Sequence, residues 1–464
     1  MAKRSSILAA LIASFIAALA AASCSSKGDS NPKSSRETFA SAIQALVEDK
    51  CASCHREGGI APFPLVTYEQ LTSFGQAAKE KVARREMPPW GAFDDETCTV
   101  RNKFQGDLSL TQEQIDMFVE WVDGGMPRGN DGARAAARTT LAPTAAGLVD
   151  KTDAYDVAVD HEVEAMGKDD IRCFPIDPKI AKDTWVSESL VVPADPKVVH
   201  HALVYIDENH EGVAKAGRAG SYPCFGGSEL TNPTLLLAWS PGGTSTTYGE
   251  DAGLPIPKGS HLVMQVHYHP IATQTTGRMS LELKRLTDKP PRIAGFVLVG
   301  NAENATDGPV ELLPGPADPP AGPAFFIPSN AKGHTETMEL RIPPSIATRL
   351  TAVGAHMHWA GVGLKLEVER REAADGQPAS ECLLNVPKYD FNWQRTYAYD
   401  APLSAAPTLS GGDRLRITCT YDNTRDNRNI ARALAERRMS KPPDIRLGGD
   451  SLDEMCQAIL VFVD

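Results

Sequence analysis

The sequence has no long run of charged residues of one sign. Its 464 residues include 47 lysines and arginines and 59 aspartates and glutamates, a formal net charge of -12, and the two signs are interspersed. Proteins that bind nucleic acid usually concentrate positive charge in a patch or stripe. The charge pattern therefore argues against nucleic acid as a partner. The length allows about three domains.

The sequence also lacks an apolar run that would span a membrane comfortably. Only Ile7–Ala22, which follows Lys3 and Arg4, approaches this character, and it is too short and too rich in alanine. Residues 1–23 therefore predict a cleaved export signal. We expect an exported protein, either periplasmic or at the cell surface.

The stretch AASC, which ends at Cys24, resembles a bacterial lipobox, in which the cysteine is lipidated and becomes the first mature residue. Ala21 stands where leucine is usual, and cleavage of an ordinary signal peptide nearby is the alternative. Residues 24–37 are rich in serine, glycine, aspartate and proline, as flexible tethers are. We expect the lipid on Cys24 to anchor the protein to the outer membrane and to be its only contact with a membrane.

A short motif, CASCH, occupies residues 51–55. C-x-x-C-H is the attachment signature of c-type haem: Cys51 and Cys54 would form thioethers with the haem, and His55 would ligate its iron. The alternative is a redox dithiol that precedes a histidine by chance, but no strand–helix–strand pattern surrounds it. The motif therefore predicts one covalent haem c.

Three helices are predicted around this motif. Capping-box spacing and apolar residues at helical intervals mark each of them. The three capping pairs are Ser34 with Glu37, Thr67 with Gln70, and Thr111 with Gln114. Together with the motif, the helices resemble a class I cytochrome c domain, which we expect at residues 38–130.

The second ligand of the iron should come from the region between the motif and the last helix. Met87 in the MPP turn is preferred, because a methionine opposite histidine raises the iron potential and the adjacent prolines would hold the sulfur in place. Met126, just after the third helix, is the alternative. Met117 lies off the apolar stripe of that helix.

The remaining sequence predicts β-structure. Residues 131–165 are rich in alanine, threonine, proline and glycine and predict a linker. Beyond them, short apolar runs alternate with glycine, proline and asparagine, and no long helical period competes. This pattern predicts β-sandwiches or jelly rolls, so the fold class is multidomain: a small all-α domain followed by all-β domains.

Histidines in three of these runs and one methionine form an ordered pattern: HH, then VHY, then HxH, then EMC. The pattern resembles the copper type II, ascorbate-dependent monooxygenases, and the resemblance covers residues 169–464. It implies two β-sandwich or jelly-roll domains, at 166–290 and 291–464, with copper in the cleft between them. It also implies two copper ions, whose ligands are His200, His201 and His267 for the first and His356, His358 and Met455 for the second.

By this resemblance the first copper stores and supplies an electron, and the second binds O2 and abstracts hydrogen. Strand geometry agrees for His356 and His358, since alternate residues point to the same face. Adjacent His200 and His201 would point to opposite faces of a regular strand, so binding one metal requires a twist, a strand end, or unlike ring nitrogens. The resemblance selects His267 over His269.

Four other histidines match no ligand position of the family. They are His161, His210, His261 and His334.

Nine cysteines are present, and an exported chain meets an oxidising compartment. With Cys24 assigned to lipid and Cys51 and Cys54 to haem, six remain, which allows fifteen pairings. The resemblance implies two of the bridges, Cys173 with Cys224 and Cys419 with Cys456. Cys98 and Cys382 have no counterpart, so a bridge between the haem and copper domains stays open.

The sequence departs from the family where its peptide hydroxylases hold the carboxylate of peptidylglycine. Those members have arginine, asparagine and tyrosine at the positions of Gly354, Gln457 and Ile459. Without the arginine a carboxylate loses its bidentate partner. This departure argues against peptidylglycine as the substrate.

We therefore expect an exported monooxygenase that hydroxylates a C–H bond of a small molecule with O2. Electrons would pass through the fused haem from an ascorbate-like reductant or another cytochrome. One alternative is a non-catalytic surface cytochrome with a copper-storing or copper-sensing module. Another is a structural sandwich pair that keeps haem for respiratory electron transfer. Met455 argues against both, because storage needs only affinity and a structural fold needs neither site.

Overall fold

The computed structural model describes most of residues 37–464, and these cluster as one unit. The positions left out within this range are 58, 60, 131–146, 149, 158, 166–169, 196, 225–226, 241–242, 244, 250, 269–272, 302–308, 374–375 and 449–451. The expected signal, the lipidated Cys24, the cap at Ser34, most of the linker, and His269 lie outside the described residues. No helix within them is long and apolar enough to cross a membrane.

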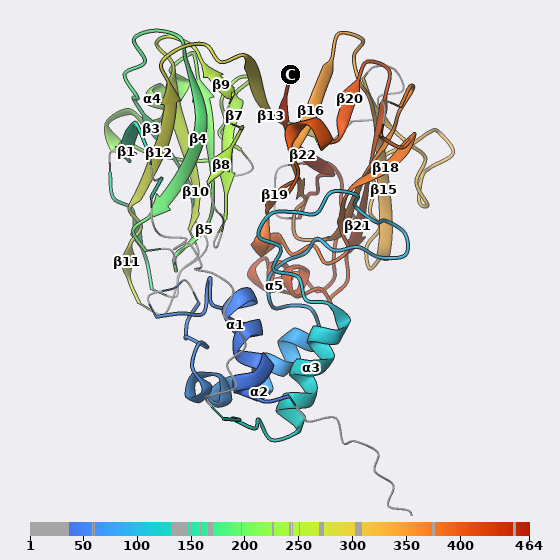
Figure 1. The fold of residues 1–464 in the computed structure, drawn as a ribbon. Coiled ribbons are helices and arrows are strands. Elements are labelled where there is room, and N and C mark those ends of the chain that lie inside the picture. The colour runs from blue at the N-terminus through green and yellow to red at the C-terminus, as the bar shows by residue number, and fades with distance from the viewer. Residues whose placement is uncertain are drawn as a thin grey trace, which may run out of the picture. The chain divides into compact units, whose positions relative to one another are not determined.

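The N-terminal helices lie together (Figure 1), and their apolar side chains form a core of their own. They are η1 Phe39–Ile43, α1 Gln44–Lys50, α2 Tyr68–Ala83 and α3 Gln112–Asp123. The capping boxes predicted at Thr67 and Thr111 are both present. The first helix begins with Thr38, whose side chain forms a capping box with Ser41.

The rest of the chain is mostly β-structure, in two successive halves. The first half contains β1 Asp153–Asp156, β2 Glu162–Val163, β3 Asp170–Ile176, β4 Thr184–Pro193, β5 Val199–Asp207, α4 Glu211–Ala216, η3 Gly217–Ala219, β6 Tyr222–Pro223, β7 Thr234–Trp239, β8 Thr246–Thr247, β9 Ala252–Ile256, β10 His261–Tyr268, β11 Thr275–Thr276 and β12 Met279–Leu286. The second half contains β13 Arg292–Gly300, β14 Val310–Leu312, β15 Lys332–Arg341, β16 Ala347–His356, β17 Gly361–Glu369, β18 Ser380–Val386, η4 Phe391–Trp393, β19 Thr396–Ala398, η5 Leu403–Ala405, β20 Thr408–Ser410, β21 Arg414–Asp422, α5 Arg428–Glu436 and β22 Gln457–Val463.

Each half has a five-stranded antiparallel sheet, and a ten-stranded sheet runs through both. The five-stranded orders are β6-β3-β10-β5-β7 and β14-β15-β21-β17-β18. The larger sheet follows β1-β12-β4-β9-β13-β22-β16-β19, with β8 paired to β4 and β20 paired to β16, and its β9–β13 contact is parallel. This contact joins the two halves, and the core of the first half includes Ala352, Ile459 and Val461 of the second. The two halves therefore pack against each other through apolar side chains.

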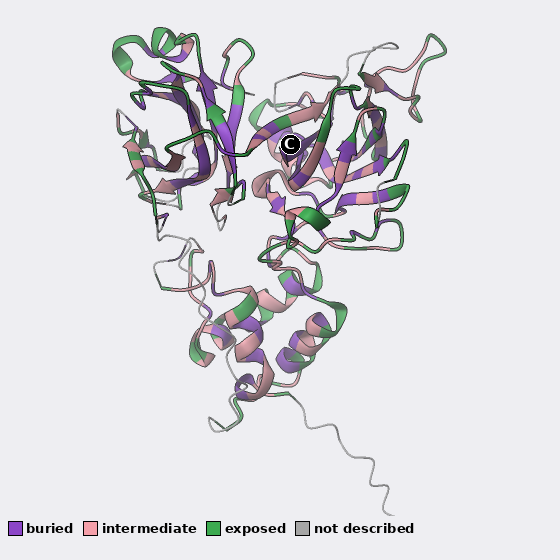
Figure 2. Cartoon of the chain, turned by 45° about the horizontal axis from the view of Figure 1, so that its top comes forward, coloured by how far each residue is buried: buried purple, intermediate pink, exposed green. Residues whose placement is uncertain are grey.

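Burial follows the strand pattern (Figure 2). Along β21, inward-facing residues are buried and their neighbours are exposed or half-buried, which is the alternation of a sheet with one face on a core. Strand β10 lies between β3 and β5 and is buried at every position after His261. Side chains on such a central, buried strand are held rigidly.

Short helices in the β-rich halves were not expected from the sequence. In the second half, α5 begins after Asn427, whose side chain accepts from the backbone N–H of Asn429. It buries Ile430, Ala433 and Leu434. Its nine residues are too few for a helical period to stand out among the surrounding strands.

The segment between α2 and α3 packs onto the second half. Trp90 and Val100 belong to the apolar core of that half, and Phe93 exchanges backbone and side-chain hydrogen bonds with Asn385. A disulfide between Cys98 and Cys382 joins the two regions. The pairing that the sequence left open is therefore present.

The two disulfides that the resemblance implied are also present, Cys173–Cys224 and Cys419–Cys456. Cys51 and Cys54 are not bonded to each other or to another cysteine. Disulfides persist in oxidising compartments, so three of them indicate an extracytoplasmic protein.

Candidate functional site

Three histidines of the first half converge on one point. His200 and His201 lie near the start of β5, and His267 lies on the neighbouring β10. His267 pairs with His201, and Tyr268 pairs with Val199, so His200 is an extra residue in β5. Such a bulge turns neighbouring side chains away from the usual alternation. The bulge therefore explains how the adjacent residues His200 and His201 reach one site.

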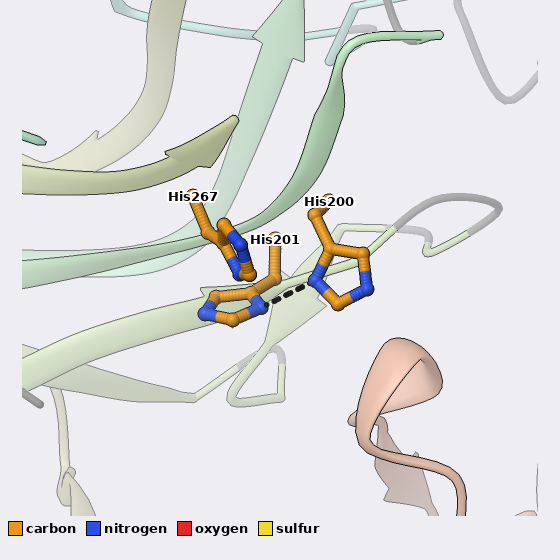
Figure 3. Close-up of side chains that lie close together, drawn as sticks. All are labelled: His200, His201 and His267. Atoms are coloured by element: carbon orange, nitrogen blue, oxygen red, sulfur yellow. Dashed lines mark hydrogen bonds between the residues drawn. The ribbon is translucent and has the colours of Figure 1, made fainter. Parts of the chain in front are cut away.

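The geometry of this cluster suits a metal ion. One ring nitrogen from each histidine lies within 4.8 Å of the others, and the Nδ1 atoms of His200 and His201 are 3.1 Å apart (Figure 3). Two imidazole nitrogens bound to one ion at about 2.0 Å are roughly 3 Å from each other. Imidazole is a favoured ligand of copper and of other transition metals. The three-histidine cluster therefore fits a copper site.

A turn from the second half of the chain covers this cluster. Phe391 of η4 lies with its ring centroid 6.0 Å from that of His200 and 6.2 Å from that of His267. Asn392 follows, and its Oδ1 lies 3.1 Å from Nε2 of His200. These residues are distant in sequence, since Asn392 lies 192 positions after His200. They shield the cluster on this side.

His356 is the last residue of β16, His358 lies two residues beyond it, and Met455 comes just before β22, which pairs with β16. The Nδ1 of His356 lies 2.6 Å from Oε1 of Gln394, and Nδ1 of His358 lies 3.1 Å from the carbonyl oxygen of Asp453. These oxygens accept hydrogen bonds, so each Nδ1 carries the proton and each Nε2 keeps a lone pair for a metal. Burial, and then His358, lower the pKa of His356 to about 4, which keeps that ring neutral.

Glu454 ties this loop together. Its side chain is fully buried and accepts hydrogen bonds from the backbone N–H groups of His358, Ala360, Gly361 and Met455, at 2.7 to 3.2 Å. Burial raises the pKa of Glu454 to about 8, against the opposing effect of these donors. One carboxyl group therefore holds His358 and Met455 in fixed relation.

Replacing Glu454 by leucine is expected to destabilise the protein by at least about 3 kcal/mol, because it leaves four buried N–H groups without an acceptor. Glu454→Gln is the matched control, since it keeps an acceptor oxygen and nearly the same volume. Urea unfolding measures the stability, and metal analysis measures copper. If leucine and glutamine variants were equally stable and bound equal copper, this role of Glu454 would be wrong.

Both ligand sets meet at one cavity of about 210 Å³. Its lining includes His201 from the three-histidine cluster and His356, His358 and Met455 from the other set. The rest is mainly apolar, including Trp239, Trp359 and Phe391, together with three glutamines. None of the described residues that line it is Asp, Glu, Lys or Arg.

Gly354 leaves no room for the arginine found in peptide hydroxylases. A Cβ at this position would lie 2.8 Å from the carbonyl oxygen of Arg395 and 3.0 Å from the side chain of Ile459. Ile459 itself lines the 210 Å³ cavity. The departure seen in the sequence is thus accompanied by close packing around Gly354.

A second cavity, of about 560 Å³, lies beside the CASCH motif and is lined by Cys51, Cys54 and His55. The Nδ1 of His55 lies 2.9 Å from the carbonyl oxygen of Phe63, so its Nε2 keeps a lone pair. The lining is mostly apolar, with three lysines, and its described residues include no Asp or Glu. Haem is a flat, mostly apolar group that carries carboxylates and can bond to two thiols. The residues that line this cavity therefore fit haem.

The two candidate axial methionines lie in different surroundings. Met87 lines the 560 Å³ cavity, whereas Met126 does not appear among the described lining residues. The sulfur of Met126 packs over Gly75 of α2, 2.4 Å from where a Cβ on that glycine would stand. The geometry favours Met87 as the residue that reaches a group in the cavity.

If the 560 Å³ cavity holds the haem that CASCH predicts and Met87 ligates its iron, Met87→Ala is expected to lower the iron reduction potential and to change the visible spectrum, because a thioether ligand would be lost. Met126→Ala is the control and should mainly lower stability, since it removes packing against α2. An unaltered spectrum for Met87→Ala, with a change in Met126→Ala, would move the ligand to Met126.

Several residues of these sites were missed in the sequence. Asn392 lies in η4, which is too short to show a helical period, and Gln394 directly follows it. Both residues form hydrogen bonds with histidines far away in the chain. Glu454 adjoins Met455 and was visible only as part of EMC. No local pattern could have marked the first two, because their roles depend on tertiary packing.

Comparisons with known proteins agree with the copper-ligand pattern at a distance. No family model matches the sequence. The chain is 28% identical to DBH-like monooxygenase protein 1 of Mus musculus over 253 residues, and to its Homo sapiens counterpart over 252. Each alignment covers 52% of this chain and 37% of the relative, so the chain spans well under half of those proteins.

Among solved structures, the major capsid protein P2 of bacteriophage PM2 aligns with 67% of this chain and 96% of its own, at 10% identity and a TM-score of 0.23. A TM-score this low does not indicate a shared fold. What the comparisons establish is a distant similarity to DBH-like monooxygenases over half of the chain.

Proposed function

We propose that this protein is an exported, copper-dependent monooxygenase that hydroxylates a C–H bond of a small uncharged molecule with O2, using electrons delivered through a c-type haem. The single observation that carries this proposal is the 210 Å³ cavity, where His201 of one cluster and His356, His358 and Met455 of the other face a common space. The distant similarity to DBH-like monooxygenases supports it.

Copper bound at the two sites would supply one-electron transfer and the activation of O2. The protein holds the ligands in place. Hydrogen bonds to Gln394 and Asp453 fix the tautomers of His356 and His358, and Glu454 fixes the backbone between His358 and Met455. Apolar side chains around the cavity exclude water, which protects a reactive centre from side reactions.

The cavity lining indicates the class of substrate. With no charged Asp, Glu, Lys or Arg among its described residues, it would bind an apolar molecule without a formal charge. The Nε2 of Gln394 is buried without a hydrogen-bond partner. Since the Oε1 of the same side chain accepts from His356, we assign this amide N–H as the donor to an oxygen of the substrate.

We assign the haem to the cavity beside Cys51, Cys54, His55 and Met87, in a cytochrome c domain at residues 38–130. A linker at 131–165 and copper domains at 166–290 and 291–464 complete the proposed organisation. The expected linker is too long at its C-terminal end, because β1 and β2 lie within it and pair with β12 and β11 of the first half. Separate apolar cores for the helices and for each β-rich half support this division. Trp90 and Val100 do not follow this division: they lie within residues 38–130 but pack into the core of the second half.

The test is copper-dependent O2 consumption by the haem-loaded protein, with ascorbate as reductant and matched neutral and charged aromatic or aliphatic compounds as substrates. Consumption should require copper, and a hydroxylated product should form only from neutral compounds. Copper binding without any oxygenation would support the storage alternative. Turnover of carboxylates or amines in preference to neutral compounds would refute the assignment of substrate class.

A further inference from the structure

We propose that electrons enter the three-histidine cluster through His200, and that Asn392 is the positioning residue that prepares His200 for this transfer. The haem and the copper that this transfer needs are those of the proposed function, on which it rests. This inference adds the route of the electron from the haem to the copper. It also gives a role to Asn392 and Asp390, two residues that belong to no metal-ligand pattern.

The three-histidine cluster lies between the two cavities. His200 lines the 560 Å³ cavity beside Cys51, Cys54 and His55, whereas His201 lines the 210 Å³ cavity that His356 shares. Adjacent residues of one strand thus face different cavities, while their Nδ1 atoms meet 3.1 Å apart (Figure 3). The cluster therefore has one histidine on the haem side and one on the substrate side.

The orientation of His200 is set by two residues of the turn before β19. The Nδ2 of Asn392 donates to Oδ1 of Asp390 at 2.7 Å. A carboxylate only accepts, so the amide oxygen of Asn392 must be the atom that faces His200, where the distance to Nε2 is 3.1 Å. Arg428 in turn pairs with Asp390.

This chain of hydrogen bonds fixes the proton on His200. An amide oxygen accepts, so Nε2 of His200 donates, and the lone pair is left on Nδ1, which faces His201. Asn392 and Trp393 also belong to the wall of the 560 Å³ cavity. The metal-binding edge and the haem-facing edge of His200 are thus opposite edges of the same ring.

The transfer moves one electron and no atom. A ferrous haem iron would become ferric as Cu(II) at the cluster becomes Cu(I), and the protons on His200 and Asn392 stay where they are. A hydrogen bond from Nε2–H to an oxygen makes Nδ1 a better donor to the metal, which favours Cu(II). Asn392 therefore sets the copper potential and holds His200 at the haem cavity.

The test uses the full chain loaded with haem and copper, and compares Asn392→Ala with Asn392→Asp. Alanine removes the acceptor, so the copper potential should rise and copper affinity should fall about 10- to 100-fold. Aspartate places a carboxylate on Nε2–H, so the potential should fall. Redox titration followed by electron paramagnetic resonance measures the potential. A lost packing contact would not move the two variants in opposite directions.

The rate of transfer tests the route. In the anaerobic chain loaded with haem and Cu(II), a light flash with an external photoreductant reduces the haem, and its first-order reoxidation by the copper of the same chain is followed. Asn392→Ala should slow it about tenfold, because His200 is no longer held at the haem cavity, and this loss should outweigh the greater driving force that a raised copper potential gives. Asn392→Asp, which still holds His200, should keep most of the rate. Asp390→Asn, which removes the orienting carboxylate but keeps Asn392, should fall between wild type and Asn392→Ala. Asn209→Ala, on an exposed turn after β5, is the matched control.

Potentials that shift in the same direction in the alanine and aspartate variants would overturn the role of Asn392. A transfer rate in Asn392→Ala equal to that of the wild type would overturn entry through His200 and leave the haem relay standing. Absence of haem oxidation in the wild type would overturn the relay itself, and the route with it.

Discussion

A variant in which Cys51 and Cys54 are both alanine is expected to retain no haem after acid–acetone extraction, whereas the wild type keeps all of it. The reason is that thioether bonds to these two thiols are the only covalent links that the CASCH motif offers. Neither thiol is used in a disulfide, and both line the 560 Å³ cavity. The measurement is haem absorbance in the protein fraction after extraction.

Ser53→Ala is the control, since it changes one of the two residues between the cysteines and removes only a hydroxyl that donates to Cys54 Sγ, leaving both thiols in place. It should keep covalent haem at the wild-type level. Retention of haem by the double alanine variant would defeat the assignment of CASCH. Loss of haem in Ser53→Ala as well would show that the variants report on folding of the motif.

Met455→Ala is expected to abolish oxygenation while weakening copper binding only in part, because a thioether favours the reduced ion at the site that faces the 210 Å³ cavity. Met455→Leu separates the sulfur from its volume, since leucine packs like methionine but cannot ligate. Both variants should lose turnover, and leucine should keep the stability of the wild type. Product formation and copper content are measured together.

His358→Ala completes the comparison. It removes one imidazole from the same site, so about one of the two coppers should be lost, with a fall in affinity of at least tens-fold. Full turnover in Met455→Leu would contradict the role of the sulfur. No oxygenation in either the wild type or the variants would favour copper storage.

Much of what the sequence predicted about the fold rested on patterns within short stretches of the chain. The capping pairs at Thr67 and Thr111 predicted the starts of α2 and α3, because each pair satisfies backbone N–H groups within its own first turn. Strand periodicity predicted that His356 and His358 share a face; β16 ends at His356, but both residues line the 210 Å³ cavity. The mostly β fold after a helical region followed from the same kind of signal.

Other features depend on packing between distant segments. The bulge that brings His200 beside His201 arises from the register of β5 against β10, and neither strand alone encodes it. Asn392 and Gln394 acquire their roles only when the second half of the chain folds over the first. The attachment of the segment between α2 and α3 to the second half could not be predicted, because the sequence does not indicate that Cys98 and Cys382 become neighbours.

The disulfide between Cys98 and Cys382 has a consequence for the order of events during biosynthesis. Its two cysteines are 284 residues apart, so Cys98 reaches the oxidising compartment long before its partner. During that interval Cys98 is a thiol on the same emerging segment as Cys51 and Cys54. Any bond that Cys51 or Cys54 formed with another of these cysteines would consume a thiol that the proposed haem attachment needs. Under the proposed function, maturation would therefore favour early attachment of haem, with closure of the long-range disulfide as a late step that also joins the segment after α2 to the second half.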